Sequence, residues 1–260
     1  KERRKQNMVP EVILPDEFKQ PDFTGMVDHG AIGVFDNFVK WDFCDSVIDS
    51  FEYWYNKKHI KEETDVKVTT FGGQELSLSP FGEGEKQFNN NHLQRKDKQL
   101  YLEIADPTVA MEINRIVGTA FEIYAKKYKG ILDSSDPVSS WTCKIQKTTS
   151  GGGYHTWHSE NGSFLYRDRV VTWMIYLNDI PLENGGATDF FHQEVSFQPK
   201  KGTVVLWPAA YTHVHRGSFL TGNISKYIAT GWFSREPGDV TNRKLGELTG
   251  QLAPKEMLNG

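Results

Sequence analysis

Cysteine is scarce in this sequence. The 260 residues contain two, Cys44 and Cys143, which lie far apart along the chain. This scarcity excludes a disulfide framework and a cysteine-rich zinc site, because both need more cysteines than the chain has. We therefore expect two ordinary buried thiols.

Long apolar runs are missing as well. No stretch reaches the roughly 18 apolar residues that a membrane-spanning helix needs. The start of the chain also carries no apolar signal segment. We therefore expect a cytoplasmic protein that makes no membrane contact. Because the chain begins with Lys1 rather than methionine, earlier removal of a leader stays open.

The sequence also lacks an excess of charge of either sign. Thirty Lys and Arg residues against 34 Asp and Glu give a formal net charge of −4. A dedicated nucleic-acid-binding protein is usually basic, so this balance argues against nucleic acid as a partner. Hydrophobic residues (38%) and aromatic residues (13%) suffice for the core of one domain of sandwich or barrel type. The sequence sets no oligomeric state.

Two segments have the spacing of amphipathic helices. Between Trp41 and Lys57, apolar side chains recur at helical intervals. A second helix is predicted to begin at Asp106, a good N-cap residue, with Pro107 in its first turn. Its apolar stripe reaches Tyr124, and its expected role is packing against a sheet.

Three other segments have the composition of irregular structure. Residues 1–30 carry several prolines among charges and are expected to form an extended lead-in. Residues 70–98 are rich in Gly, Ser, Asn and Gln, and we expect a mobile loop there, a candidate cover for a site. Residues 236–260 read as a polar tail.

From about residue 138 onward the pattern changes to short strands. Runs rich in β-branched and aromatic residues alternate with turn signals such as TTSGGG, ENGG and PKKG. The runs are WTCKIQ, VVTWMIYL, VSFQ, TVVLW and KYIATGWF. Such regular punctuation is typical of a β-sandwich or barrel. We expect residues 31–235 to form a single domain of the α+β class, mainly β, in which helices buttress this β core.

A candidate metal site lies in the stretch GYHTWHSE. Residues two apart on a strand point to the same face, so His158 and Glu160 can reach one cation together, whereas His155 points to the opposite face. A third ligand must come from a distant strand, and YTHVHRG offers His213 and His215. Two histidines with one carboxylate form the facial triad of non-haem iron(II) oxygenases.

Several stretches together resemble one enzyme family. GGGYHTWHSE, RVVTWMIYLNDIPLENGGATDFF, FQPKKGTVVLW and HRGSFLTGNISKYIATGWF are similar, in order and spacing, to the core of 2-oxoglutarate/Fe(II) oxygenases of the prolyl 4-hydroxylase type. The similarity spans roughly residues 141–233, and the earlier GVFDNFVKWDFCDSVIDSF is similar to the helix that introduces this domain. The resemblance implies a double-stranded β-helix, a jelly-roll type barrel flanked by helices.

The resemblance also implies a role for particular residues. His158, Glu160 and His215 would be the iron ligands; His215 fits better than His213 because the family's distal histidine is followed two residues later by glycine, here Gly217. His213 stays open as the alternative. The expected co-substrate residues are Lys226 and Tyr176, which would hold the far carboxylate of 2-oxoglutarate, and Thr230 and Trp232, which would line its pocket.

Two features depart from the family pattern. Glu160 stands where the family usually has aspartate, which leaves open whether one or two carboxylate oxygens coordinate the metal. The interval from His215 to Lys226 is one residue longer than usual, and the turn at 221–223 would absorb the difference.

The implied activity is Fe(II)- and 2-oxoglutarate-dependent hydroxylation, with release of succinate and carbon dioxide and ascorbate as a supporting reductant. The family name favours a prolyl residue of a peptide or protein as the substrate, although one fold serves many substrates. Arg169, Arg216 and residues 70–98 are candidates for the opening of the site. Two alternatives stay open: the same chemistry on a small molecule or nucleobase, and a non-catalytic cupin-like binding module.

Overall fold

The structure is a computed structural model that describes residues 22–60, 65–69, 75–88, 92–132, 137–140 and 142–235. Most of the predicted lead-in and all of the predicted tail lie outside the described residues. In the described part, strands outnumber helices, which confirms the expectation of a mainly β protein. No described helix is both long enough and apolar enough to cross a bilayer.

The main sheet has ten strands, and the strand pairs within it are antiparallel. Its order is β1-β2-β13-β10-β15-β8-β6-β5, with β7 paired to β15 and β9 paired to β6. The bounds are β1 (Val27–Asp28), β2 (Gly33–Phe35), β13 (Val204–Pro208), β10 (Arg169–Tyr176), β15 (Lys226–Arg235), β8 (Lys144–Thr148), β6 (His92–Tyr101), β5 (Phe81–Phe88), β7 (Val138–Ser139) and β9 (Gly153–Tyr154).

Two smaller sheets accompany it. One has the order β12-β11-β14, made of β12 (Val195–Phe197), β11 (Thr188–Phe190) and β14 (His215–Gly217). The other pairs β3 (Val66–Thr69) with β4 (Glu75–Leu78). Short 3₁₀ turns interrupt the loops: η1 (Lys129–Ile131), η2 (Phe164–Tyr166), η3 (Leu182–Asn184) and η4 (Tyr211–His213).

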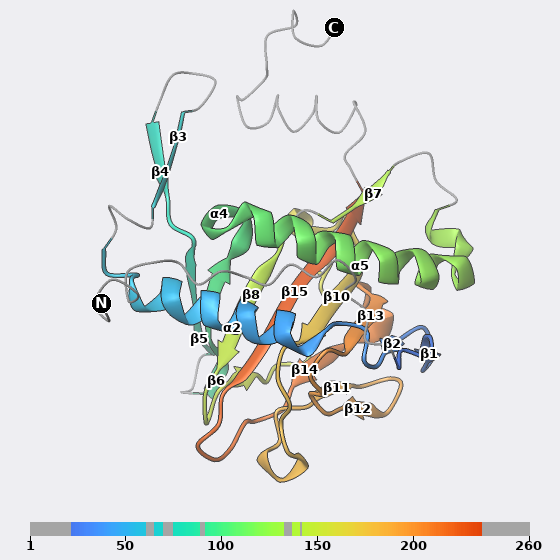
Figure 1. The fold of residues 1–260 in the computed structure, drawn as a ribbon. Coiled ribbons are helices and arrows are strands. Elements are labelled where there is room, and N and C mark those ends of the chain that lie inside the picture. The colour runs from blue at the N-terminus through green and yellow to red at the C-terminus, as the bar shows by residue number, and fades with distance from the viewer. Residues whose placement is uncertain are drawn as a thin grey trace, which may run out of the picture.

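Two long helices cover one face of the main sheet. Figure 1 shows α2 (Trp41–Asn56) and α5 (Pro107–Lys127) running side by side across β8, β15 and β10, with the short α4 (Leu102–Ala105) before α5. Both helices bury the apolar stripes that their sequences predict, so both helix predictions are confirmed. Cys44 and Cys143 are free and buried in the core beneath them, as expected.

The strand period of two divides the side chains of β15 between the two faces of the sheet. Ala229 and Phe233 belong to the core under the helices. Lys226, Ile228, Thr230 and Trp232 line a cavity on the opposite face. One strand therefore carries both the packing that fixes it and the polar groups of the site.

The prediction of a mobile loop at 70–98 is wrong for its described part. Residues 75–78, 81–88 and 92–98 lie in strands, and β6 pairs with β5 on one side and with β8 on the other. These ladders satisfy backbone hydrogen bonds that a loop would leave to water. Polar composition misled the prediction, because Arg95, Asp97 and Gln99 face the polar cavity rather than solvent.

The β structure also begins earlier in the chain than expected. The strands β1, β2, β5 and β6 precede residue 138, and all four belong to the main sheet. The strands β1 and β2 were missed because they are only two and three residues long, too short for a visible alternation.

The start of α5 gives a test of the local fold. The Asp106 side chain accepts a hydrogen bond of 3.2 Å from the Val109 backbone N–H, as an N-cap should. Asp106→Ala is expected to lower the free energy of unfolding by about 1 kcal/mol, and Asp106→Ser by much less. Urea denaturation compares the three proteins; equal midpoints for the alanine variant and the parent would contradict the capping role.

Candidate metal centre and its cavity

Backbone pairing brings the two predicted ligand segments together. The N–H of His158 donates to the carbonyl of His215, and the N–H of His215 donates to the carbonyl of His158, both at 3.0 Å. This antiparallel bridge joins the segment after β9 to the start of β14. The ring centroids of the two imidazoles are 4.4 Å apart as a result.

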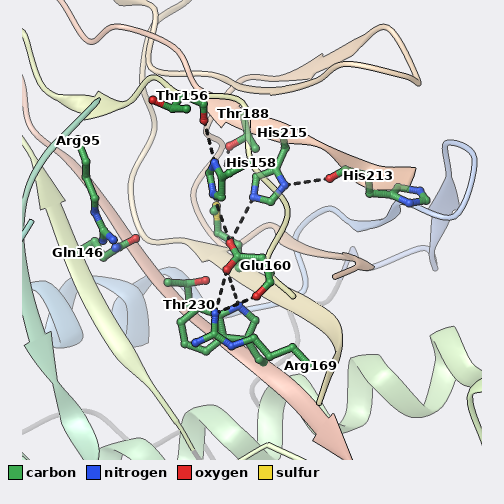
Figure 2. Close-up of polar contacts among 12 residues, drawn as sticks. Arg95, Gln146, Thr156, His158, Glu160, Arg169, Thr188, His213, His215 and Thr230 are labelled. Carbon is green, nitrogen blue, oxygen red and sulfur yellow. Dashed lines mark hydrogen bonds and ion pairs between the residues drawn. The ribbon is translucent and has the colours of Figure 1, made fainter. Parts of the chain in front are cut away.

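The Glu160 carboxylate completes the cluster. Its Oε1 lies 3.5 Å from Nε2 of His158 and 3.4 Å from Nε2 of His215. The three side chains offer ligand atoms that all lie within 4.8 Å of one another, and no other group of this kind occurs among the described residues. Figure 2 shows both rings pointing down onto the carboxylate. The predicted trio is thus brought together by the fold.

Hydrogen bonds to the backbone fix the tautomer of each imidazole. Nδ1 of His158 lies 2.8 Å from the carbonyl of Thr156, and Nδ1 of His215 lies 3.0 Å from the carbonyl of His213. A carbonyl only accepts, so each Nδ1 must carry the proton. In the neutral rings, Nε2 then presents a lone pair toward Glu160, which is the form that binds a metal.

The second oxygen of Glu160 is held from the other side. Oε2 accepts hydrogen bonds from Nε1 of Trp232 at 3.0 Å and from the Arg169 guanidinium at 3.2 Å. The guanidinium also lies over the indole ring, 3.4 Å from its centre. Oε1 alone therefore faces the two imidazoles. This arrangement favours one-oxygen coordination and uses the extra methylene that glutamate has over aspartate.

The other candidate histidines point elsewhere. Nε2 of His213 hydrogen-bonds the carbonyl of Gly30 at 2.8 Å, and its Nδ1 lies 3.0 Å from the Thr212 hydroxyl. His155 hydrogen-bonds the carbonyl of Gly217 and stacks on Phe219. Both rings are engaged away from Glu160.

A cavity of about 560 Å³ opens beside the cluster. Lys226 lines it and is 7% exposed, and its ammonium donates a 2.6 Å hydrogen bond to the carbonyl of Gly186. Burial lowers the pKa of Lys226 to about 8, against the opposing charge of Asp189. Thr230 and Trp232 also line the cavity, as expected.

Tyr176 does not line the cavity, in contrast to the role expected for its hydroxyl. That hydroxyl donates to Thr188 Oγ1 at 2.8 Å, and Thr188 is the residue that lines the cavity. Thr188 accepts from Tyr176 and itself donates only to the weak acceptor Met174 Sδ, at 3.9 Å, so a stronger acceptor on a ligand can take over its proton. The tyrosine is therefore one hydrogen bond removed from the cavity, where it positions the threonine.

Several lining residues were not singled out from the sequence. They come from β6, β8 and β11, and the most polar are Arg95, Asp97, Lys144, Gln146 and Thr188. A signal existed in CKIQ, where Lys144 and Gln146 alternate with the apolar Cys143 and Ile145. Alternation of this kind is usually taken to mark a solvent-facing side, but here the polar side faces an internal cavity.

Two family models give the class of protein, and the fold and the His-Glu-His cluster agree with it. A family model described as the 2OG-Fe(II) oxygenase superfamily matches residues 143–234, and one described as phytanoyl-CoA dioxygenase matches residues 29–188. The chain belongs to the 2-oxoglutarate/Fe(II) oxygenases. This membership makes it a dioxygenase and implies Fe(II) and 2-oxoglutarate as its cofactor and co-substrate. A comparison with curated proteins finds no match.

Solved structures support the same fold. A prolyl-4-hydroxylase from Pseudomonas putida is 16% identical with a TM-score of 0.53, over 80% of this chain and 94% of that one. A prolyl hydroxylase from Trichoplax adhaerens, in complex with a hypoxia inducible factor peptide, is 18% identical with a TM-score of 0.50, over 83% and 86%. These similarities show the fold alone, which is the predicted double-stranded β-helix.

The choice between the two distal histidines is open to a direct test. His215→Ala removes an Nε2 that faces Glu160. It is expected to weaken metal binding by about 100-fold or more, because loss of a residue that only orients a metal ligand already costs about 10- to 100-fold in affinity. His213→Ala keeps the backbone carbonyl that orients His215 and should leave metal affinity near that of the parent. Titration with Fe(II) under anaerobic conditions measures both. The reverse ranking would make His213 the ligand.

Proposed function

We propose that His158, Glu160 and His215 hold Fe(II), and that Lys226 holds the far carboxylate of 2-oxoglutarate. The observation that carries this proposal is the meeting of two Nε2 atoms and one carboxylate oxygen, at 3.4 and 3.5 Å, while each Nδ1 is already engaged by a backbone carbonyl. One cation between these three atoms would bind all of them. Two imidazoles and one carboxylate suit Fe(II) and leave positions open for co-substrate and oxygen.

The remaining residues have supporting parts in this proposal. Arg169 and Trp232 keep Oε2 of Glu160 turned away from the metal, so that only Oε1 binds. Lys226 supplies a buried positive charge, and Thr188, held by Tyr176, supplies a hydroxyl donor for the same carboxylate. A charge-assisted contact is roughly twice as strong as a neutral one. Fe(II) and 2-oxoglutarate, once bound, supply the oxygen activation that yields succinate, carbon dioxide and a hydroxylated substrate.

The co-substrate assignment predicts a defined defect at Lys226. Lys226→Ala should raise the dissociation constant of 2-oxoglutarate by about 10- to 100-fold, because a hydrogen bond to a charged group contributes about 1.5–3 kcal/mol. Iron binding should stay unchanged. In the parent protein, affinity for 2-oxoglutarate should fall as the pH rises above about 8, where Lys226 loses its proton.

Calorimetry with the Fe(II)-loaded protein under anaerobic conditions measures these effects. Lys200→Ala is the matched control, since Lys200 is exposed and pairs with Asp36 far from the cavity. Equal affinity for 2-oxoglutarate in the Lys226 variant and in this control would contradict the assignment of Lys226 to the far carboxylate. Purified protein with Fe(II), ascorbate and 2-oxoglutarate should also release succinate slowly without substrate; the benefit of ascorbate remains a prediction.

We infer that the substrate is a prolyl residue of a peptide or protein. The structural neighbours described as prolyl hydroxylases support this inference, one of them in complex with a peptide. Exposed apolar side chains in η2, directly after the metal segment, also support a peptide-binding surface: Phe164 is 63% exposed and Leu165 is 80% exposed. Apolar groups left in water are often binding sites.

Mass spectrometry of proline-containing peptides after incubation tests the substrate class. The expected product is heavier by one oxygen atom on proline and forms together with extra succinate. A His158→Ala variant serves as the inactive control. Oxygen incorporation into an acyl-CoA or another small molecule, with none in any peptide, would contradict the peptide assignment and leave the oxygenase chemistry intact.

A further inference from the structure

The cavity contains a second buried lysine besides Lys226. Lys144 lies at the start of β8, is 7% exposed and lines the same cavity. Its ammonium lies 4.9 Å from the centre of the Trp232 ring. Within the described part of the chain this ammonium makes no hydrogen bond or ion pair, and its contact with the ring compensates part of the cost of burial. A cation over an aromatic ring offsets part of that cost.

The carboxylates near Lys144 are already engaged. Asp97 accepts hydrogen bonds from Arg95 at 2.7 Å and from Gln99 at 2.8 Å. Glu160 faces the imidazoles with one oxygen and is held by Arg169 and Trp232 at the other. Both acids stabilise the Lys144 charge through space and raise its pKa, but neither contacts its ammonium. A buried charge without a partner is costly, and a protein retains one where a ligand supplies the counter-charge.

Burial and the charge of Arg95 together lower the pKa of Lys144 to about 8, with Glu160 acting in the opposite direction. The side chain therefore stays mostly protonated at neutral pH. It presents a positive charge to whatever enters the cavity beside the metal centre.

The co-substrate does not account for this charge. Lys144 pairs in the sheet with Thr230, whereas Lys226 pairs with Thr148 at the other end of the β8–β15 ladder. Thr230 lies four positions after Lys226 on β15, about 13 Å along a strand. The far carboxylate of 2-oxoglutarate, held by Lys226, would therefore lie at the other end of this ladder from Lys144, and its near carboxylate would be taken up by the metal. Lys144 instead adjoins Trp232, which contacts Glu160.

We propose that Lys144 binds a carboxylate of the prime substrate, so that this oxygenase acts on molecules with an acidic group close to the carbon that is hydroxylated. For a peptide, that group is either the side chain of an Asp or Glu next to the hydroxylated residue or the free carboxylate of a C-terminal residue. The proposal rests on the function proposed above and adds a charge requirement to it. Lys226 keeps its proposed role of holding the far carboxylate of 2-oxoglutarate.

The test uses the full chain loaded with redox-inert Zn(II), with and without 2-oxoglutarate. Four short peptides are the probes: a blocked peptide with Pro-Glu, its Pro-Gln counterpart, a peptide ending in proline with a free carboxylate, and the same peptide as an amide. Calorimetry measures their binding to the parent, to Lys144→Met and to Lys96→Met. Lys96 is exposed and does not line the cavity, so its variant controls for loss of one positive charge.

One acidic probe is expected to bind the parent and Lys96→Met about tenfold tighter than its neutral counterpart, since a charge-assisted contact of this strength changes affinity by that factor. Lys144→Met should lose this preference. The acidic probe that shows this preference identifies the source of the carboxylate: a neighbouring acidic side chain or a free C-terminus. A preference that survives in Lys144→Met, equal binding of acidic and neutral probes, or no binding of any probe at millimolar concentration overturns the proposal.

Two further measurements distinguish a substrate-binding role of Lys144 from a co-substrate-binding or a structural role. The affinity for 2-oxoglutarate should be the same in Lys144→Met and the parent; a large loss would assign Lys144 to the co-substrate. If 2-oxoglutarate does not bind the parent, the proposed function is wrong. The peptide probes still test Lys144 in that case, because their binding is also measured in the absence of 2-oxoglutarate. Thermal unfolding of Lys144→Met should occur at or above the temperature of the parent, because an uncompensated buried charge is removed. A marked loss of stability would make Lys144 a structural residue and overturn the proposal.

Discussion

Two imidazole Nε2 atoms face one carboxylate oxygen in the cavity of this fold, at 3.4 and 3.5 Å. The fold holds them there through the reciprocal backbone bridge between His158 and His215 and through the carbonyls that accept from each Nδ1. A metal cation suits this arrangement, because two imidazoles and one carboxylate are the ligands that Fe(II) takes in such sites. The rest of the cavity is organised around this constraint, from the orientation of Glu160 to the burial of positive charge nearby.

The glutamate is the unusual member of the trio, and its surroundings explain how it fits. Trp232 and Arg169 bind the oxygen that points away from the imidazoles, and the guanidinium packs on the indole ring. These contacts restrict a side chain that has one more rotatable bond than aspartate. Such partners of a metal ligand tune its orientation and basicity. The buried ammonium groups of Lys226 and Lys144 also lower the stability of the folded protein. Such a loss of stability is common at sites where activity is favoured.

Local patterns in the sequence predicted much of the fold and part of the candidate metal centre. The spacing of apolar residues predicted α2 and α5, and Asp106 with Pro107 predicted where α5 begins. The alternation in the later strands and the His-x-Glu spacing, read with the family resemblance, predicted which side chains would meet. The helices, the strands and the His158–Glu160 pair depend on neighbours a few residues apart, which a single sequence displays directly; the assignment of the distant His215 came from the family resemblance.

The features that were missed depend on partners distant in the chain. Residues 75–98 are polar in composition, and only pairing with β8 shows that β6 is an interior strand of the sheet. Whether Tyr176 or Thr188 reaches the cavity depends on a hydrogen bond between two strands. The inward polar face of β8, which holds Lys144, becomes visible only once the cavity is known.

The most direct test of the central claim is a crystal structure of the protein grown anaerobically with Fe(II) and 2-oxoglutarate, with anomalous diffraction measured at the iron edge. The account predicts one iron peak bonded to Nε2 of His158, Nε2 of His215 and Oε1 of Glu160, with Oε2 still bound to Trp232. An iron peak elsewhere, or a peak that lacks any one of these three ligands, would contradict it.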